Sequence, residues 1–421
     1  MPRSCPRIAA TALALAGGLL WLLIGAGTAV AAGPDNVWVA LAPLPEHETE
    51  AVLAIAVSPS DSQLVLVGTP AGTIYRSTNG GASWTQVARQ LGRGISALSF
   101  NPFKPGLAFA GTRAAGIFQS ADGGVTWARP PGSTDLSIRG FAFGKSVAAA
   151  GSSHGVLVSL AGAPWAPRGL GHVGVSAVAM AAVNDPARIV AGGDASTHDD
   201  PLPLYFSPDA GGNWSPVKAP PAANNIVAAL AAGPLPPRSD TRPLLLGTNS
   251  GAFVSGDNGN TWAQLQGLPA TDFNAVAYGR DRADHFYLAS DGGATEHGGL
   301  WGTGDGGRSF RNLNAPVPSI SAMALSNEDS PTLYAASFRV SDHAVMLWAL
   351  KDAGGVPSGP VGGVPIPQAR AAHSATGSAP AADQWRLLLS GPEGPFLVVG
   401  MGASLVLLLA LVAYLRRGRR L

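Results

Sequence analysis

The octapeptide Ser77-Thr78-Asn79-Gly80-Gly81-Ala82-Ser83-Trp84 indicates the fold, because its pattern returns along the chain. The pattern has Ser or Thr first, Asp or Asn third, Gly fifth, Ser, Thr or Asn seventh, and Trp or Phe last. Further copies occupy residues 120–127, 207–214, 255–262 and 303–310. Five copies in register indicate that the chain is built from an internal repeat.

Each copy is expected to form the corner of a β-hairpin. The side chain at the third position can accept hydrogen bonds from backbone N–H groups of its own turn, and the Gly at the fifth position permits a positive φ. The aromatic residue then starts the next strand and packs between sheets. We therefore expect a structural role for Asn79, Asp122, Asp209, Asp257, Asp305, Trp84, Trp127, Trp214, Trp262 and Phe310.

Short apolar runs before each copy have the length of β-strands. Residues 65–69 and 74–77 are one such pair, and a further run, as in 95–100, precedes each pair. Four short strands in ~45 residues fit one blade of a β-propeller. Two more units lack the full motif, one ending at Trp165 and one at residues 333–350, which brings the count to seven. The sequence predicts an all-β seven-bladed β-propeller, with residues 37–41 as the outer strand of the last blade.

The two ends of the chain suggest a membrane location. Residues 1–33 have two arginines, an apolar run and small residues, the pattern of a signal peptide, or of a signal anchor if uncleaved. The propeller is assigned to 34–351 and a Gly/Pro/Ala-rich flexible stalk to 352–395. The uncharged residues 396–415 are long enough for a transmembrane helix, and 416–421 form a basic cytoplasmic tail. We expect a single-pass protein of the cell membrane with its propeller outside the cytoplasm, or a two-pass protein if the first segment stays.

Charge and cysteine content exclude several classes of function. Only 13% of the residues are charged, and residues 33–391 hold 21 Lys or Arg against 25 Asp or Glu. A nucleic-acid partner is not expected, because the body has no excess of basic residues. The one cysteine, Cys5, precedes the body, so no disulfide, cysteine nucleophile or Cys-based zinc site can form there. We predict no metal site and no cofactor.

The octapeptides resemble the Asp-box, or bacterial neuraminidase, repeat over residues 37–350. This repeat occurs in sialidases, in xyloglucan-acting glycoside hydrolases, in the sortilin ectodomain and in the photosystem II assembly/stability factor family. The last family is similar in size and is also exported. The resemblance implies a propeller whose Asp-box corners lie on one rim, away from the usual binding face. It does not imply one function, because the fold serves many.

The catalytic residues of the enzymes with this repeat have few counterparts. Sialidases use an arginine cluster and a tyrosine activated by a glutamate, whereas the body has only five Glu and five Tyr, the latter inside expected strands. A two-carboxylate glycosidase needs a pair across a cleft. Outside the repeat, Asp135, Asp272 and Glu48 are the plausible members of such a pair. The photosystem factor family has an arginine-rich surface, which this body does not reproduce.

Polar residues gather on loops that are expected to share one face. In a propeller the loops between the second and third strands lie on the same face as the loops between blades, and the Asp-box corners lie on the other. The candidate binding residues on this face are Glu46, Glu48, Glu50, His154, His198, Asp199, Asp200, Glu296, His297 and His343. Such a patch suits a cation, a basic segment or a sugar. The alternative is that these are long surface loops whose side chains are hydrated.

The sequence predicts a membrane-anchored, monomeric propeller that binds or assembles a protein or a surface polysaccharide without catalysis. The alternative is an anchored glycoside hydrolase, sialidase- or xyloglucanase-like, that uses carboxylates of the same face. A hydrolase would bring two or three carboxylates together at the channel mouth, with at least one in an apolar setting that raises its pKa. A scaffold would show a broad patch without that convergence.

Overall fold

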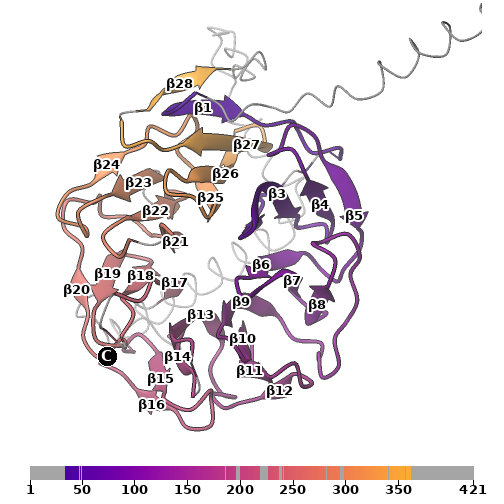
Figure 1. Ribbon diagram of the computed structural model, residues 1–421, viewed down its shortest axis with the longest axis vertical. Coiled ribbons are helices and arrows are strands. Elements are labelled where there is room, and N and C mark those ends of the chain that lie inside the picture. The colour runs from indigo at the N-terminus through magenta and orange to yellow at the C-terminus, as the bar shows by residue number, and fades with distance from the viewer. Residues whose placement is uncertain are drawn as a thin grey trace, which may run out of the picture. The chain divides into compact units, whose positions relative to one another are not determined.

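The computed structural model describes residues 34–361, apart from 47, 49, 185, 196–199, 219–225, 237, 238, 240, 281, 294–297, 340 and 356. Seven sheets surround one axis like the blades of a propeller (Figure 1). The prediction of an all-β seven-bladed propeller is confirmed. We number the blades along the chain and call their strands A to D from the inside outwards.

The first three blades end at Pro167. Blade 1 contains β2 (Ala54–Ser58), β3 (Asp61–Gly68), β4 (Ile74–Ser77) and β5 (Thr85–Ala88). Blade 2 contains β6 (Ile95–Asn101), β7 (Lys104–Thr112) and β8 (Ile117–Ser120). Blade 3 contains β9 (Ile138–Phe143), β10 (Val147–Ser152), β11 (Gly155–Leu160) and β12 (Ala166–Pro167). In blade 2 a single bridge between Gln119 and Ala128 replaces strand D.

Blades 4 to 7 complete the ring. Blade 4 contains β13 (Val175–Ala182), β14 (Arg188–Gly193), β15 (Leu204–Ser207) and β16 (Ser215–Pro216), and blade 5 contains β17 (Val227–Ala232), β18 (Leu244–Thr248), β19 (Gly251–Ser255) and β20 (Ala263–Gln264). Blade 6 contains β21 (Ala275–Tyr278), β22 (Phe286–Ser290), β23 (Gly299–Thr303) and β24 (Arg311–Asn312). Blade 7 contains β25 (Ile320–Leu325), β26 (Thr332–Arg339), β27 (Ala344–Lys351), β1 (Val37–Ala40) and β28 (Ser358–Val361).

The N-terminal strand β1 closes the ring, as predicted from the sequence. It pairs antiparallel with β27, with Trp38 opposite Leu350. Trp38 is fully buried, and its Nε1 donates a hydrogen bond of 2.7 Å to the carbonyl oxygen of Leu313 in blade 6. The first and last parts of the propeller therefore share one sheet.

The sheet continues beyond Lys351, into the part of the chain assigned to the stalk. Strand β28 pairs in parallel with β1. Asp352 is buried, and both of its carboxylate oxygens accept hydrogen bonds from Arg311 Nη2, at 3.0 and 2.7 Å. This buried ion pair attaches the chain after β27 to blade 6. A Gly/Pro-rich composition gives no sign of such a contact, because the contact depends on one distant arginine.

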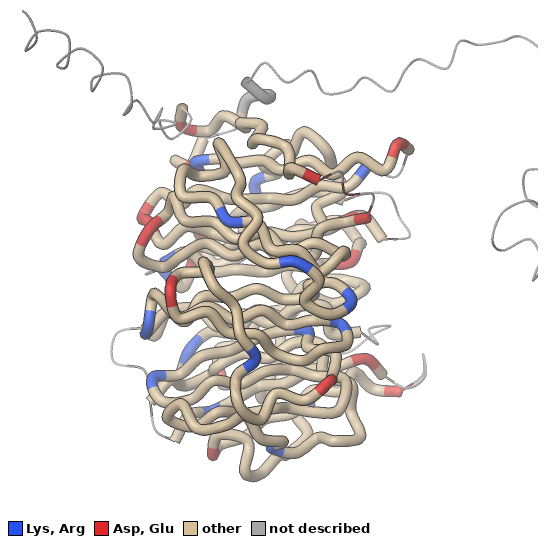
Figure 2. The backbone as a smooth tube through the Cα atoms, turned by 90° about the vertical axis from the view of Figure 1, so that its right-hand side faces the viewer, with Lys and Arg blue, Asp and Glu red and all other residues tan. Residues whose placement is uncertain are grey.

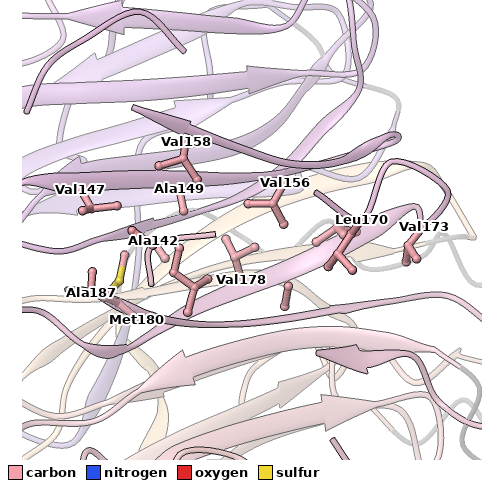
Figure 3. Packing of buried hydrophobic residues seen from close by; sticks show 14 residues of the cluster. Ala142, Val147, Ala149, Val156, Val158, Leu170, Val173, Val178, Met180 and Ala187 are labelled. Atoms are coloured by element: carbon pink, nitrogen blue, oxygen red, sulfur yellow. The ribbon is translucent and has the colours of Figure 1, made fainter. Parts of the chain in front are cut away.

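Apolar side chains fill the spaces between neighbouring blades. Figure 3 shows one such cluster, in which Val147 and Val158 of blade 3 face Val178 and Met180 of blade 4. Side chains alternate along each strand, so one face of a blade packs on the preceding blade and the other face on the following blade. The core of the propeller is thus a ring of such layers.

Hydrogen bonds also join the inner strands of neighbouring blades. Ser176 Oγ in blade 4 donates to the carbonyl oxygen of Val227 in blade 5, and Asn274 Nδ2 donates to that of Ile320, at 3.0 Å. Ser96 and Ser321 donate in the same way to the next blade. These small polar side chains satisfy carbonyl groups near the axis and hold adjacent blades in register.

The predicted signal segment (1–33), transmembrane helix (396–415) and basic tail (416–421) lie outside the described residues. Within the described part of the chain, no helix is long and apolar enough to cross a membrane.

Candidate functional site

The five repeated octapeptides form hairpin corners between strands C and D. In blade 2, Ser120 Oγ donates to Asp122 Oδ1 at 2.7 Å, and the same oxygen accepts the backbone N–H of Thr126 at 2.9 Å. Thr126 Oγ1 closes the loop by donating to Asp122 Oδ2 at 2.6 Å. These hydrogen bonds from Thr126 hold the pKa of Asp122 well below its ordinary value. The corner uses both carboxylate oxygens, which confirms the expected hairpin geometry.

The other four corners repeat this arrangement. The side chains at their third positions accept hydrogen bonds from residues of their own turn: Asn79, Asp209, Asp257 and Asp305. Ser309 donates to Asp305 through its hydroxyl and its backbone N–H, and these bonds lower the pKa of that carboxyl.

The two faces of the propeller follow from the antiparallel order of the strands. We call the face with the A–B turns and the C–D corners the box face, and the opposite face the loop face. On both, basic and acidic residues are interspersed, and Figure 2 shows this along one side of the molecule.

The acidic segment before blade 1 does not present three free carboxylates. Glu46 forms an ion pair with Arg89. Glu48 is buried. The burial of Tyr75, and next the charge of Glu48, raise the pKa of Tyr75. Glu50 is exposed. These three glutamates therefore have different environments and do not form one uniform patch.

The structure describes only part of the predicted His-bearing patch. His154 is exposed, with its Nδ1 3.1 Å from Ser153 Oγ. His343 is exposed and packs edge-on against Phe338. Asp200 is exposed. The remaining four candidates lie outside the described residues: His198, Asp199, Glu296 and His297. Among the residues that the structure describes, no group of three His, Cys, Asp or Glu side chains is placed to hold a metal ion.

The candidate carboxylates for hydrolysis have partners of their own. Asp135 forms an ion pair of 2.7 Å with Arg129. Asp272 lies on the loop before blade 6, where it accepts hydrogen bonds from Thr271 Oγ1 and Ser290 Oγ. Burial, and next the charge of Asp291, raise the pKa of Asp272.

A groove of about 1080 Å³ lies between blades 2 and 3 on the box face. Lys104, Trp127, Arg129, Lys145 and Trp165 are among the residues that line it. None of its lining residues is Asp or Glu. The sequence analysis did not find this groove.

The groove exists because blade 3 lacks a complete corner. In blade 2 the corner packs so tightly on blade 1 that a Cβ on Gly124 would lie 2.7 Å from the Leu66 side chain, and a Cβ on Gly211 of blade 4 would lie 2.9 Å from Arg168 Cβ of blade 3. The corner of blade 3 is one residue shorter and has no Asp. A Cβ on its Gly162 would meet no atom within 4 Å. The missing Asp and the shorter corner are the features of the sequence from which this groove could have been predicted.

Comparison with known proteins gives matches in structure only. No protein-family model matches the chain, and no curated protein matches it in sequence. The GH74 xyloglucanase from Xanthomonas campestris aligns with a TM-score of 0.54 and 18% identity, over 73% of this chain and 55% of that chain. An ancestral GH74 enzyme aligns with a TM-score of 0.54 and 16% identity, over 75% of this chain and 48% of that chain.

Two structures of YCF48 match as well. YCF48 from Cyanidioschyzon merolae aligns with a TM-score of 0.50 and 17% identity, over 75% of this chain and 98% of that chain. YCF48 bound to D1 peptide aligns with a TM-score of 0.53 and 16% identity, over 78% of this chain and 99% of that chain. The chain shares the fold of these proteins. It spans about half the length of the two GH74 structures and nearly the whole of the two YCF48 structures.

Proposed function

We propose that this protein is a non-enzymatic binding propeller of the Asp-box type that holds a partner protein outside the cytoplasm. The observation that carries the proposal is the groove between blades 2 and 3. Its volume of about 1080 Å³ suits a ligand, yet no carboxylate lines it. A glycosidase needs two carboxylates at its cleft, so this groove supports binding without hydrolysis.

The described carboxylates also favour binding. Glu46 and Asp135 are each paired with an arginine. Asp272 lies near Asp291, whose charge contributes, after burial, to its raised pKa. A glycosidase needs two carboxyl groups across its cleft. The arginine partners of Glu46 and Asp135 make these two carboxylates poor candidates for the second member of such a pair.

The likeness to YCF48 agrees with this proposal. YCF48 corresponds to this propeller over nearly its whole length, and one of its structures holds a D1 peptide. In our proposal the propeller is a monomer, residues 1–33 direct export, and residues 396–415 anchor the chain in the cell membrane. Cell fractionation of the full chain and of a chain that ends at residue 395 tests the anchor. Recovery of both in the membrane pellet would contradict it.

The second candidate function is glycoside hydrolysis, and one observation favours it. Asp272 has the raised pKa and the neighbouring carboxylate that a general acid requires. The xyloglucanase from Xanthomonas campestris shows that the shared fold is compatible with an enzyme. In this reading Asp272→Asn abolishes cleavage of the polysaccharide.

Affinity capture distinguishes the two functions. The full-length chain serves as bait in crosslinked native membranes and in cell-wall extract, with mass spectrometry and glycan analysis as readouts. A protein partner recovered reproducibly supports the proposal, and the double variant His198→Ala/Asp200→Ala then shows whether the loop face contributes. Retention of a polysaccharide that becomes shorter on incubation, and that Asp272→Asn protects, would establish the hydrolase instead.

A further inference from the structure

The groove between blades 2 and 3 concentrates a residue type that this chain uses sparingly. The sequence has four lysines, and two of them, Lys104 and Lys145, line the groove. Lys104 is the first residue of strand B of blade 2, Lys145 stands on the A–B turn of blade 3, and both are exposed. Within the described part of the chain, neither ammonium group has an ion-pair or hydrogen-bond partner. Both positive charges are therefore available to a ligand.

Three of the neutral polar side chains that line the groove are already engaged within the protein. Asn101 Oδ1 accepts the backbone N–H of Phe103, and Ser159 Oγ donates to the carbonyl oxygen of Ala163 at 2.6 Å. Thr126 Oγ1 donates to the carboxylate of its own corner. A neutral sugar would need hydrogen-bonding groups such as these, to which the lining adds Gln119 and Ser146. An anion needs only the free ammonium groups, with which it forms charge-assisted hydrogen bonds.

Apolar surface surrounds these charges. Trp127 is half-buried, and Pro130 and Pro131 continue the same wall. The groove therefore combines cations with a wall for apolar side chains, which together suit a polypeptide better than a highly hydrated anionic glycan.

We propose that this groove binds an extended acidic segment of the partner protein. Carboxylates of that segment meet Lys104 and Lys145, and a neighbouring apolar side chain packs against Trp127. Arg129 contributes less, because Asp135 already pairs with it at 2.7 Å. The inference rests on the protein-binding function proposed above, to which it adds the surface and the chemistry of the partner.

Selection from a random twelve-residue peptide library on the immobilised full-length protein tests this inference. We expect the recovered peptides to be enriched in Asp and Glu next to an aromatic or branched apolar residue. In titrations with a labelled selected peptide, Lys104→Glu/Lys145→Glu should weaken binding at least tenfold. Ala163→Trp, which narrows the groove without changing charge, should also weaken it. Raising the salt concentration should weaken binding to the unaltered protein, because the contacts are exposed and ionic.

Lys218→Glu is the matched control, since Lys218 is an exposed lysine at the end of blade 4, outside the groove. It should leave the peptide affinity within twofold. Peptides without acidic residues, failure to recover any peptide, or equal binding to the charge-reversed groove would overturn the inference. So would binding of a uronate polysaccharide that depends on both lysines in place of peptides.

The inference and the function can fail separately. If affinity capture still finds a protein partner that Lys104→Glu/Lys145→Glu does not release, the protein-binding function holds and the groove is the wrong surface. If no protein partner is captured and a polysaccharide is cleaved, the function itself is wrong.

Discussion

Removal of the Trp38 indole should open the ring, because this side chain joins the two ends of the propeller. Trp38 is fully buried in β1 and packs in one cluster with Trp348 and Leu350 of β27. Replacement of a core Trp by Ala costs about 3–5 kcal/mol. We expect Trp38→Ala to lower the free energy of unfolding by that amount.

The milder change Trp38→Phe separates packing from hydrogen bonding. Phe keeps most of the apolar contact but cannot donate to the carbonyl oxygen of Leu313, which Trp38 Nε1 reaches at 2.7 Å. A buried acceptor left without its donor costs about 1–3 kcal/mol. The free energy of unfolding of Trp38→Phe should therefore lie between those of the unaltered protein and of Trp38→Ala.

Urea unfolding followed by circular dichroism measures these losses, and hydrogen exchange locates them. Backbone amides of β27 that pair with β1 should exchange faster in Trp38→Ala, because that edge loses its partner. Trp127→Phe is the control: its indole donates to Gly124 of its own corner, so β27 should exchange at the normal rate. If Trp38→Ala lowers the free energy of unfolding by less than ~1 kcal/mol and leaves hydrogen exchange in β27 unchanged, β1 does not close the ring as we describe.

Three further outcomes follow from buried or paired carboxylates. Asp352→Asn should lower the free energy of unfolding by about 3 kcal/mol in urea titrations, because it leaves the Arg311 guanidinium without its buried counter-ion; an unchanged midpoint would contradict this. Asp272 has a raised pKa in the folded protein, so its ionisation destabilises the fold as the pH rises above ~4. Asp272→Asn should therefore raise the Tm at pH 7, and should raise it less at pH 4. A lower Tm of this variant at pH 7 would contradict this expectation. Asp122 has a lowered pKa, so the stabilisation that its carboxylate provides is present above pH ~4 and is lost as the pH falls further. Asp122→Asn should therefore have a lower Tm than the unaltered protein at pH 7, and this difference should shrink in acid. A difference that stays constant with pH would argue against the carboxylate as its cause.

The sequence was sufficient for the parts of the fold that depend on local contacts. Each corner is held by bonds within eight residues, as between Asp122 and Thr126, so its pattern can be recognised without the structure. The role of β1 was also predictable, because the last blade lacked one strand. Strand β28 was not, since its attachment depends on the pairing of Asp352 with Arg311, 41 residues earlier in the chain.

The candidate site was less predictable, because it depends on contacts between blades. Composition placed Glu48 on a polar loop, but folding buries it near Tyr75. Asp272 and Asp291 lie near each other although their loops stand on either side of strands A and B of blade 6. The groove results from a corner that is incomplete, and the packing that Gly162 fails to make can be seen only against the neighbouring blade.

Photocrosslinking in living cells tests the central claim most directly. A photoreactive amino acid in place of Ala163 reports what occupies the groove of the full-length protein, and the same amino acid in place of Lys218 serves as the control. We predict a discrete protein adduct from position 163, absent from position 218 and lost when Lys104→Glu and Lys145→Glu are added. Absence of any protein adduct at position 163, together with shortening of a cell-surface polysaccharide by the unaltered protein, would contradict the account.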